Sequence, residues 1–207
     1  MNFSERWEEV YLNKKTKAVY DDWLDKYKYI LNNCKSCVLD LGCGIGNNTL
    51  YLKERGFDVL ACDYSKNALK ILESEIKGVK TLLHDISKPF DFEDNSFELI
   101  IADLCLHYFD TETTKNVLRE IKRILVPNGY LLARVNSIND VNHGAGQGEK
   151  IEENFYFVNG YNKRFFDEKI AKDFFSIIGD AEVKEADLNR LKKPKKLIEI
   201  CVKNNKI

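Results

Sequence analysis

Proline is scarce in this chain, and long apolar segments and an excess of either charge are missing. Each of these features excludes a class of protein. The 207 residues include only 3 Pro and 11 Gly, which excludes collagen-like and low-complexity compositions. No apolar run approaches the roughly 20 residues that a membrane-spanning helix needs. The 32 basic and 33 acidic side chains lack the basic excess typical of nucleic-acid-binding proteins. The composition is globular and argues against nucleic acid as the main partner.

The six cysteines form neither a recognisable zinc site nor a disulfide framework. Cys34 and Cys37 have the spacing of a metal or redox pair, but no second pair of ligands stands at zinc-site spacing. We therefore expect no metal and two reduced thiols there, with a redox or metal role as the alternative. Residues 1–9 are charged and aromatic and lack the apolar core of a signal peptide. Together these features predict a cytoplasmic protein.

Short apolar runs alternate with amphipathic segments through most of the chain. Helical periodicity covers residues 3–31, and further helices are expected near 47–56, 65–78, 111–125 and 167–178. Strands are expected at 37–41, 57–62, 79–84, 97–102, 130–135, 181–187 and 196–202. The last two should form an antiparallel pair at a sheet edge. This order predicts an α/β three-layer sandwich, with a Rossmann-like sheet of seven mostly parallel strands and an antiparallel last strand.

Three glycines follow the first predicted strand: Gly42, Gly44 and Gly46. Such a turn lets the backbone approach a ligand closely, and the helix start beyond it offers free N–H groups. The spacing differs from the dinucleotide fingerprint, because Asn47 stands where the third glycine would be. Asp40, inside the strand, suits a cation better than a pyrophosphate. A nucleotide-dependent oxidoreductase is therefore disfavoured, although it stays an alternative.

Carboxylates stand at or near the ends of four predicted strands: Asp40, Asp63, Asp85 and Asp103. In an open parallel sheet, ligands bind beyond the carboxyl ends of the strands. A carboxylate in the position of Asp63 can accept hydrogen bonds from both hydroxyls of a ribose. Four such residues around one glycine turn predict a ligand site at this edge of the sheet.

These segments together resemble the class I S-adenosylmethionine-dependent methyltransferases over about residues 35–135. The matching residues are 38–46, 62–65, 84–86, 97–108 and 125–131. The resemblance, closest to the small-molecule branch, implies an enzyme that transfers a methyl group from S-adenosyl-L-methionine to a small-molecule acceptor, with S-adenosyl-L-homocysteine as product. We expect a single methyltransferase domain over 1–207, with an N-terminal helical cap at 1–33 and a lid or substrate insert at 137–165.

The resemblance also implies which residues contact the cofactor. Asp63 would accept from the ribose hydroxyls and Asp85 from the adenine amino group, while Asp40 and Asp103 would lie near the methionyl end. The full expected set comes from the ends of the first four strands: Asp40, Gly42, Gly44, Gly46, Asp63, Tyr64, Asp85, Ile86, Asp103 and Leu104.

His107, on the loop after the fourth strand, is the candidate general base if the acceptor must lose a proton. Its alternative role is packing within the loop. The polar residues from Arg134 to Asp140 either bind a polar substrate or form a salt bridge under the insert. The aromatic residues at 155–166 either wall an acceptor or anchor the insert. Trp7 and Tyr11 share a helix face, which either closes over the cofactor or staples the helix to the sheet.

A non-catalytic protein of the same fold, which binds the cofactor as a regulatory or scaffold subunit, is the alternative function. The segment after the fourth predicted strand reads Asp103-Leu104-Cys105-Leu106 and lacks the Asn/Asp-Pro-Pro-aromatic sequence of enzymes that methylate amino groups of nucleic-acid bases. This lowers the expectation of a nucleic-acid substrate. The atom that receives the methyl group and the oligomeric state stay open.

Overall fold

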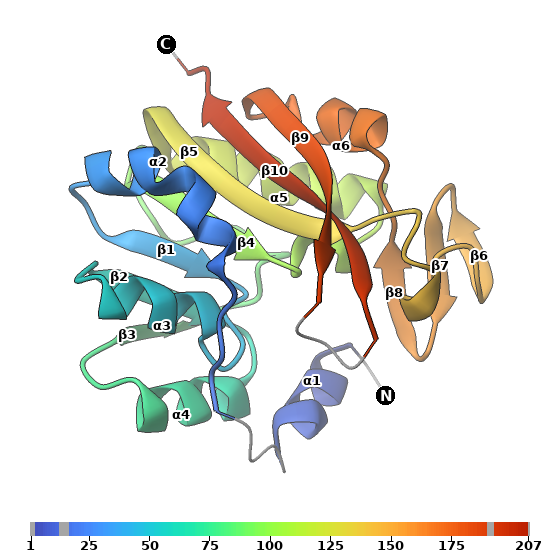
Figure 1. Cartoon of the computed structure of the whole chain (residues 1–207), viewed down its shortest axis with the longest axis horizontal. Coiled ribbons are helices and arrows are strands. Elements are labelled where there is room, and N and C mark those ends of the chain that lie inside the picture. Colours follow the sequence, from blue (N-terminus) through green and yellow to red (C-terminus); the bar gives the residue numbers. More distant parts are fainter. Residues whose placement is uncertain (1–2, 13–16, 190–192, 207) are drawn as a thin grey trace.

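Seven strands form one twisted sheet in the computed structural model, which describes residues 3–12, 17–189 and 193–206 (Figure 1). The strand order is β3-β2-β1-β4-β5-β10-β9. The first five strands pair in parallel, and β10 is antiparallel to both β5 and β9. The strands are β1 (Val38–Leu41), β2 (Val59–Asp63), β3 (Lys80–Leu83), β4 (Phe97–Asp103), β5 (Leu125–Asn136), β9 (Gly179–Leu188) and β10 (Lys195–Asn204). The predicted fold class is confirmed.

Helices cover both faces of this sheet. The helical elements are α1 (Phe3–Leu12), η1 (Asp22–Tyr27), α2 (Lys28–Asn33), α3 (Asn47–Glu54), α4 (Lys66–Glu75), η2 (Leu106–Tyr108), α5 (Thr111–Ile124), η3 (Val141–His143) and α6 (Glu168–Phe175). The apolar stripes of α5 and α6 pack on one face, and those of η1, α2 and α3 pack on the other. Alternate residues of β4 point to opposite cores, because side chains alternate along a strand. The sheet is therefore buried on both sides.

The N-terminal region departs from the predicted continuous helix. Residues 17–21 are not helical and separate α1 from η1 and α2. The backbone N–H of Val19 donates to the Asn47 side chain at 2.9 Å, and the Asp21 carboxylate binds Arg134. Val19 itself is 60% exposed, although it lies in the segment with helical periodicity. Contacts with distant residues here override the local helical periodicity.

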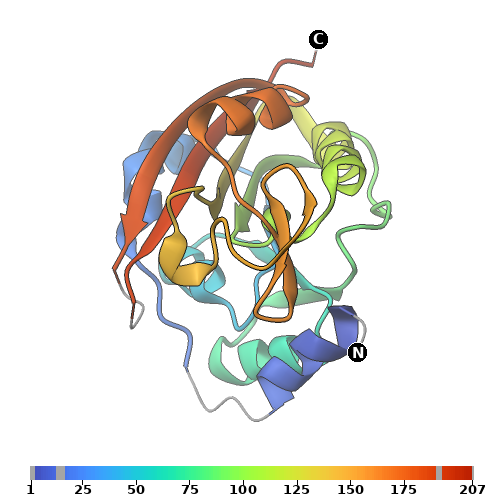
Figure 2. The same cartoon turned by 90° about the vertical axis from the view of Figure 1, so that its right-hand side faces the viewer.

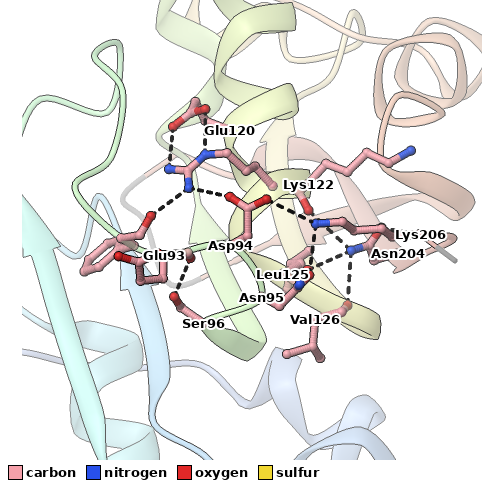
Figure 3. A network of polar contacts seen from close by, with 12 residues as sticks. Glu93, Asp94, Asn95, Ser96, Glu120, Lys122, Leu125, Val126, Asn204 and Lys206 are labelled. Atoms are coloured by element: carbon pink, nitrogen blue, oxygen red, sulfur yellow. Dashed lines mark hydrogen bonds and ion pairs between the residues drawn. The ribbon is translucent and has the colours of Figure 1, made fainter.

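Side chains close the ends of two helices. Ser65 accepts a hydrogen bond from the Ala68 N–H at 3.2 Å, which confirms it as the N-cap of α4. Asn204 Nδ2 on β10 donates to the carbonyls of Lys122, Leu125 and Val126, at and just beyond the end of α5 (Figure 3). Helix ends leave carbonyls without intrahelical partners, so this amide ties the last strand to α5.

The long connection after β5 contains a small antiparallel sheet that the sequence reading did not anticipate. Its strands, in the order β6-β7-β8, are β6 (Glu149–Glu152), β7 (Phe155–Val158) and β8 (Tyr161–Arg164). Asn159 and Gly160, with φ of 53° and 80°, form the turn between β7 and β8. Figure 2 shows this sheet standing beside the main one, with its β7–β8 hairpin next to α1. None of the described helices combines the length and apolar character that crossing a bilayer requires.

Candidate functional site

A pocket of about 410 Å³ opens at the carboxyl ends of β1, β2, β3 and β4, the edge where ligands bind in open parallel sheets. Segments that follow these four strands form most of its wall, and α1 contributes two aromatic rings. The lining residues are Trp7, Tyr11, Gly42, Cys43, Gly44, Ile45, Asn47, Asn48, Asp63, Tyr64, His84, Asp85, Ile86, Asp103, Leu104, Cys105, Tyr108 and Phe109.

Most of the residues expected to bind the cofactor lie on this wall: Gly42, Gly44, Asp63, Tyr64, Asp85, Ile86, Asp103 and Leu104. Asp40, Gly46 and His107 do not. The wall also contains side chains to which sequence reasoning gave no role, among them Asn48 and Tyr108. Both stand within a few residues of a predicted site position. This closeness in sequence is the signal that could have identified them as pocket residues.

The three glycines of the turn all have a positive φ, and a Cβ at any of them would clash with a neighbouring side chain. Gly42 has a φ of 66°, and a Cβ there would lie 2.4 Å from the Cβ of Cys105. Gly44 has a φ of 54°, and a Cβ there would lie 2.9 Å from the Tyr11 hydroxyl. Gly46, at a φ of 91°, would instead press against the side chains of α4. Gly46 therefore packs against these side chains and does not line the pocket, and its expected contact with the cofactor stays a prediction.

Asp63, the last residue of β2, holds the turn in shape. One carboxylate oxygen accepts from the Gly44 N–H at 2.8 Å, and the other accepts from the Ser65 N–H at 2.9 Å. The side chain is largely buried, and this burial raises the pKa of Asp63 although backbone N–H groups oppose the shift. Both oxygens thus lie between the glycine turn and the start of α4, at the pocket wall.

Asp40 lies beneath the turn, with 1% of its surface exposed. Its carboxyl accepts a hydrogen bond from Thr49 Oγ1 at 2.5 Å. Burial raises the pKa of Asp40 to about 7, and the negative charges of Asp103 and Asp63 add to the shift. Asp40 does not line the pocket, and its expected place near the methionyl amine, directly or through water, stays a prediction.

Arg134 fixes the carboxylate of Asp103 at the methionyl end of the predicted site. Its Nε and Nη2 each donate to Asp103 at 2.7 Å, and Nη1 donates to Asp21 at 2.7 Å. The guanidinium lies 4.6 Å from the ring centroid of Trp23 and is almost completely buried. Of the two open interpretations, the salt bridge is therefore correct for Arg134, although it joins the segment before η1 and not the insert. Asn48 Nδ2 also reaches Asp103, at 3.3 Å.

His107 is 2% exposed, and its Nδ1 has no hydrogen-bond partner among the residues whose positions are described. Burial lowers the pKa of His107 well below its usual range, and the positive charges of Lys195 and Lys163 lower it further. The imidazole is therefore neutral near pH 7. It packs 4.3 Å from the ring of Tyr108, which does line the pocket. The catalytic role of His107 stays a prediction.

Helix α1 lies against the pocket and carries Trp7 and Tyr11 to its wall. Glu8 anchors this helix, because its carboxylate accepts from Ser65 Oγ at 2.9 Å and from the Lys66 N–H at 2.8 Å at the start of α4. The Trp7 ring lies 5.4 Å from that of Tyr108. The shared face of Trp7 and Tyr11 thus closes one side of the pocket.

The wall suits a cofactor that carries a cation, a ribose and an adenine but no phosphate. Asp63, Asp85 and Asp103 bring three carboxylates to it, and its described lining includes no lysine or arginine. Gly42 and Gly44 bring backbone without side chains to the wall, at positive φ values that favour glycine. Within the described segments, no cluster of three or more His, Cys, Asp or Glu side chains is placed to hold a metal ion.

Comparison with known proteins identifies relatives of the central segment. Residues 39–133 match the model of a methyltransferase domain. The chain is 33% identical over 140 residues to the probable S-adenosyl-L-methionine-dependent methyltransferase TehB of Haemophilus influenzae, which covers 64% of this chain and 47% of that protein. It is 26% identical over 180 residues to the tRNA N(3)-cytidine methyltransferase METTL2 of Gallus gallus, covering 80% and 47%. The chain thus spans about half the length of these curated relatives.

Solved structures share the whole fold at low sequence identity. The 1,6-didemethyltoxoflavin-N1-methyltransferase of Burkholderia thailandensis, with bound S-adenosylhomocysteine, has a TM-score of 0.72 at 18% identity, covering 98% of this chain and 87% of that one. TehB of Haemophilus influenzae has a TM-score of 0.64 at 22% identity, covering 96% and 67%. The central segment of the chain is thus similar to a methyltransferase domain, and the whole chain has the fold of these solved structures.

Proposed function

We propose that this protein transfers the methyl group of S-adenosyl-L-methionine to a small-molecule acceptor and releases S-adenosyl-L-homocysteine. The observation that carries the proposal is the pocket itself, where a glycine turn and three carboxylates converge at the carboxyl edge of the sheet. The sulfonium of the cofactor supplies a reactive methyl group, so the chain's own residues need mainly to hold and align the two reactants.

Several residues in and behind the wall have a proposed task. Asp63 accepts from the ribose hydroxyls, Tyr64 lies against the adenine, and Asp85 accepts from its amino group beside the Ile86 backbone. The methionyl end lies along Gly42 and Gly44, bordered by Asp103 and Leu104, with the Asp40 carboxyl beneath the turn. Arg134 is a positioning residue, since it holds Asp103 through two hydrogen bonds of 2.7 Å.

We keep His107 as the proposed general base for an acceptor that must lose a proton. Its neutral imidazole can accept a proton. It packs against the ring of Tyr108, which lines the pocket. Replacement by Asn should then lower kcat at least tenfold at saturating acceptor without changing cofactor affinity. A packing role would instead lower the melting temperature and leave kcat within twofold.

A small-molecule acceptor is favoured over nucleic acid by the charge of the chain. Its net charge is −1, and no lysine or arginine stands in the described lining of the pocket. The tRNA-modifying relative named above keeps RNA as the competing substrate, to be tested beside small molecules.

We also propose a cytoplasmic location, supported by six free cysteines in the structure.

Calorimetric titration with S-adenosyl-L-homocysteine tests the core of this proposal. We expect the wild-type protein to bind it and Asp63→Asn to bind it at least tenfold more weakly, because the amide cannot accept from both ribose hydroxyls. The matched control is Asp58→Asn, the same change at a half-exposed carboxylate that pairs with Lys80 outside the pocket. Absence of binding by the wild type, or equal affinity of the two variants, contradicts the proposal. Binding without homocysteine release from any acceptor would leave a non-catalytic cofactor-binding protein.

A further inference from the structure

Two basic side chains lie over the ring of Tyr161 on β8. The guanidinium carbon of Arg6 is 4.6 Å from the ring centroid, and Lys163 Nζ is 5.7 Å from it. Neither cation has a carboxylate within ion-pair distance in the part of the chain that the structure describes. Among the residues that the structure describes, the Lys163 ammonium donates one hydrogen bond, a long one of 3.3 Å to the His143 carbonyl.

This pair of cations stands beside the pocket and outside its cofactor wall. Tyr161 contacts two rings that line the pocket, Trp7 at 5.4 Å and Tyr108 at 6.2 Å between centroids. Figure 2 shows how this comes about, because α1 and the tip of the β7–β8 hairpin lie next to each other. The two cations therefore come from segments more than 150 positions apart in the sequence, and both lie over Tyr161, whose ring contacts two rings of the pocket wall.

The local electrostatics leave the charge of Lys163 uncompensated. Burial lowers the pKa of the Lys163 ammonium, and the neighbouring positive charge of Lys195 lowers it further. Asp140 is the carboxylate that opposes this shift, but it already accepts from Lys195 Nζ at 2.8 Å and bonds His143 Nδ1 at 2.8 Å. A half-buried cation without a counterion is costly, and a bound anion would recover that cost.

The guanidinium of Arg6 packs against the turn of the same hairpin. Gly160 stands directly before Tyr161, and a Cβ there would lie 1.9 Å from Arg6 Nη2. The missing side chain thus leaves room for the guanidinium against the hairpin backbone. Phe165 and Phe166, which follow β8, are buried in the core, whereas Tyr161 is partly exposed and contacts two rings of the pocket wall.

We propose that the methyl acceptor is a small aromatic acid, whose anionic group is bound by Arg6 and Lys163 while its ring packs against Trp7, Tyr108 and Tyr161. This inference rests on the proposed function, because it assigns the acceptor of the same site. Arginine and lysine both bind carboxylates through charge-assisted hydrogen bonds, and flat apolar groups pack well on aromatic rings. The small sheet β6-β7-β8 then serves as the part of the fold that selects the acceptor.

Titration of the protein saturated with S-adenosyl-L-homocysteine tests this assignment, with benzoate as the probe and benzamide as its neutral counterpart. We expect wild type to bind benzoate at least tenfold more tightly than benzamide. Lys163→Met and Arg6→Met should each weaken benzoate binding at least tenfold, and Lys163→Arg should retain it within threefold. The matched control is Lys150→Met on β6, which removes an equal charge from an exposed lysine paired with Glu153.

Cofactor affinity is measured first for every variant, so that the two proposals fail separately. Wild type that does not bind S-adenosyl-L-homocysteine refutes the proposed function. Wild type that binds it but prefers neither probe, or equal benzoate affinities of Lys163→Met and Lys150→Met, refutes the anionic acceptor. A tRNA transcript provides the last arm: if Lys163→Met weakens only its binding, the two cations bind an RNA phosphate and the small-acid assignment is wrong.

Discussion

At the scale of single residues, the direction of a side chain decides whether a predicted site residue reaches the ligand. Asp63 and Asp103 end their strands and lie on the pocket wall. Asp40 lies within β1, where alternation turns it with Val38 toward α3 and Thr49. The convergence of carboxylates could be predicted, since parallel strands end at one edge of a sheet. The burial of Asp40 required knowledge of what covers that face.

This burial gives Asp40 a measurable effect on stability against pH. Its pKa is about 7 in the folded protein, against about 3.9 in an unfolded chain. The folded state therefore holds a proton that the unfolded state has lost, and this contribution to stability decreases as pH rises from about 4 to about 7. Asp40→Asn keeps an acceptor for Thr49 and cannot ionise. Relative to wild type, it should gain about 3 kcal/mol of unfolding free energy between pH 5 and pH 8.

Chemical denaturation of both proteins at several pH values measures this difference. Asp91→Asn, the same substitution at an exposed position, is the control and should follow the wild-type curve. Parallel curves for wild type and Asp40→Asn would show that Asp40 ionises in the folded state as it does in the unfolded chain.

At the scale of elements, the helices and strands of the main sheet could be predicted because their periodicity agrees with their burial. Two segments could not. Residues 17–21 carry helical periodicity, but Arg134 and Asn47 bind them in an extended form. The small sheet β6-β7-β8 has strands of only four residues, too short for a clear alternation, although Asn159-Gly160 is a recognisable hairpin turn.

The attachment of α1 to α4 gives a prediction at this scale. Glu8 binds the free N–H groups and the cap residue Ser65 at the start of α4, where the helix dipole also favours a negative charge. Glu8→Ala should release α1, which carries Trp7 and Tyr11, and weaken S-adenosyl-L-homocysteine binding threefold to tenfold. Titration calorimetry measures the change. Glu9→Ala, at the adjacent exposed position, should bind as wild type does, and an unaltered affinity of Glu8→Ala would exclude a closing role for the helix.

At the scale of the whole molecule, a nearly neutral chain separates its charges between two sides of one pocket. The total charge is −1, yet the cofactor wall carries Asp63, Asp85 and Asp103 with no cation in its described lining. Arg6 and Lys163 stand beyond the aromatic rings of the same pocket. Composition could not predict this separation, because the basic side comes from α1 and β8, which meet only in the folded chain.

The acidic wall should distinguish the cofactor from its product by charge. S-adenosyl-L-methionine has a sulfonium that S-adenosyl-L-homocysteine lacks, and sinefungin has an ammonium at a nearby position. Opposite charges a few ångströms apart at a partly exposed site attract by about 1 kcal/mol, which corresponds to about fivefold in affinity. We therefore expect sinefungin to bind about threefold to tenfold more tightly than S-adenosyl-L-homocysteine at low salt. The ratio should decrease at 0.5 M NaCl, because salt screens the attraction, whereas a ratio that ignores salt would mean that shape and not charge separates the two ligands.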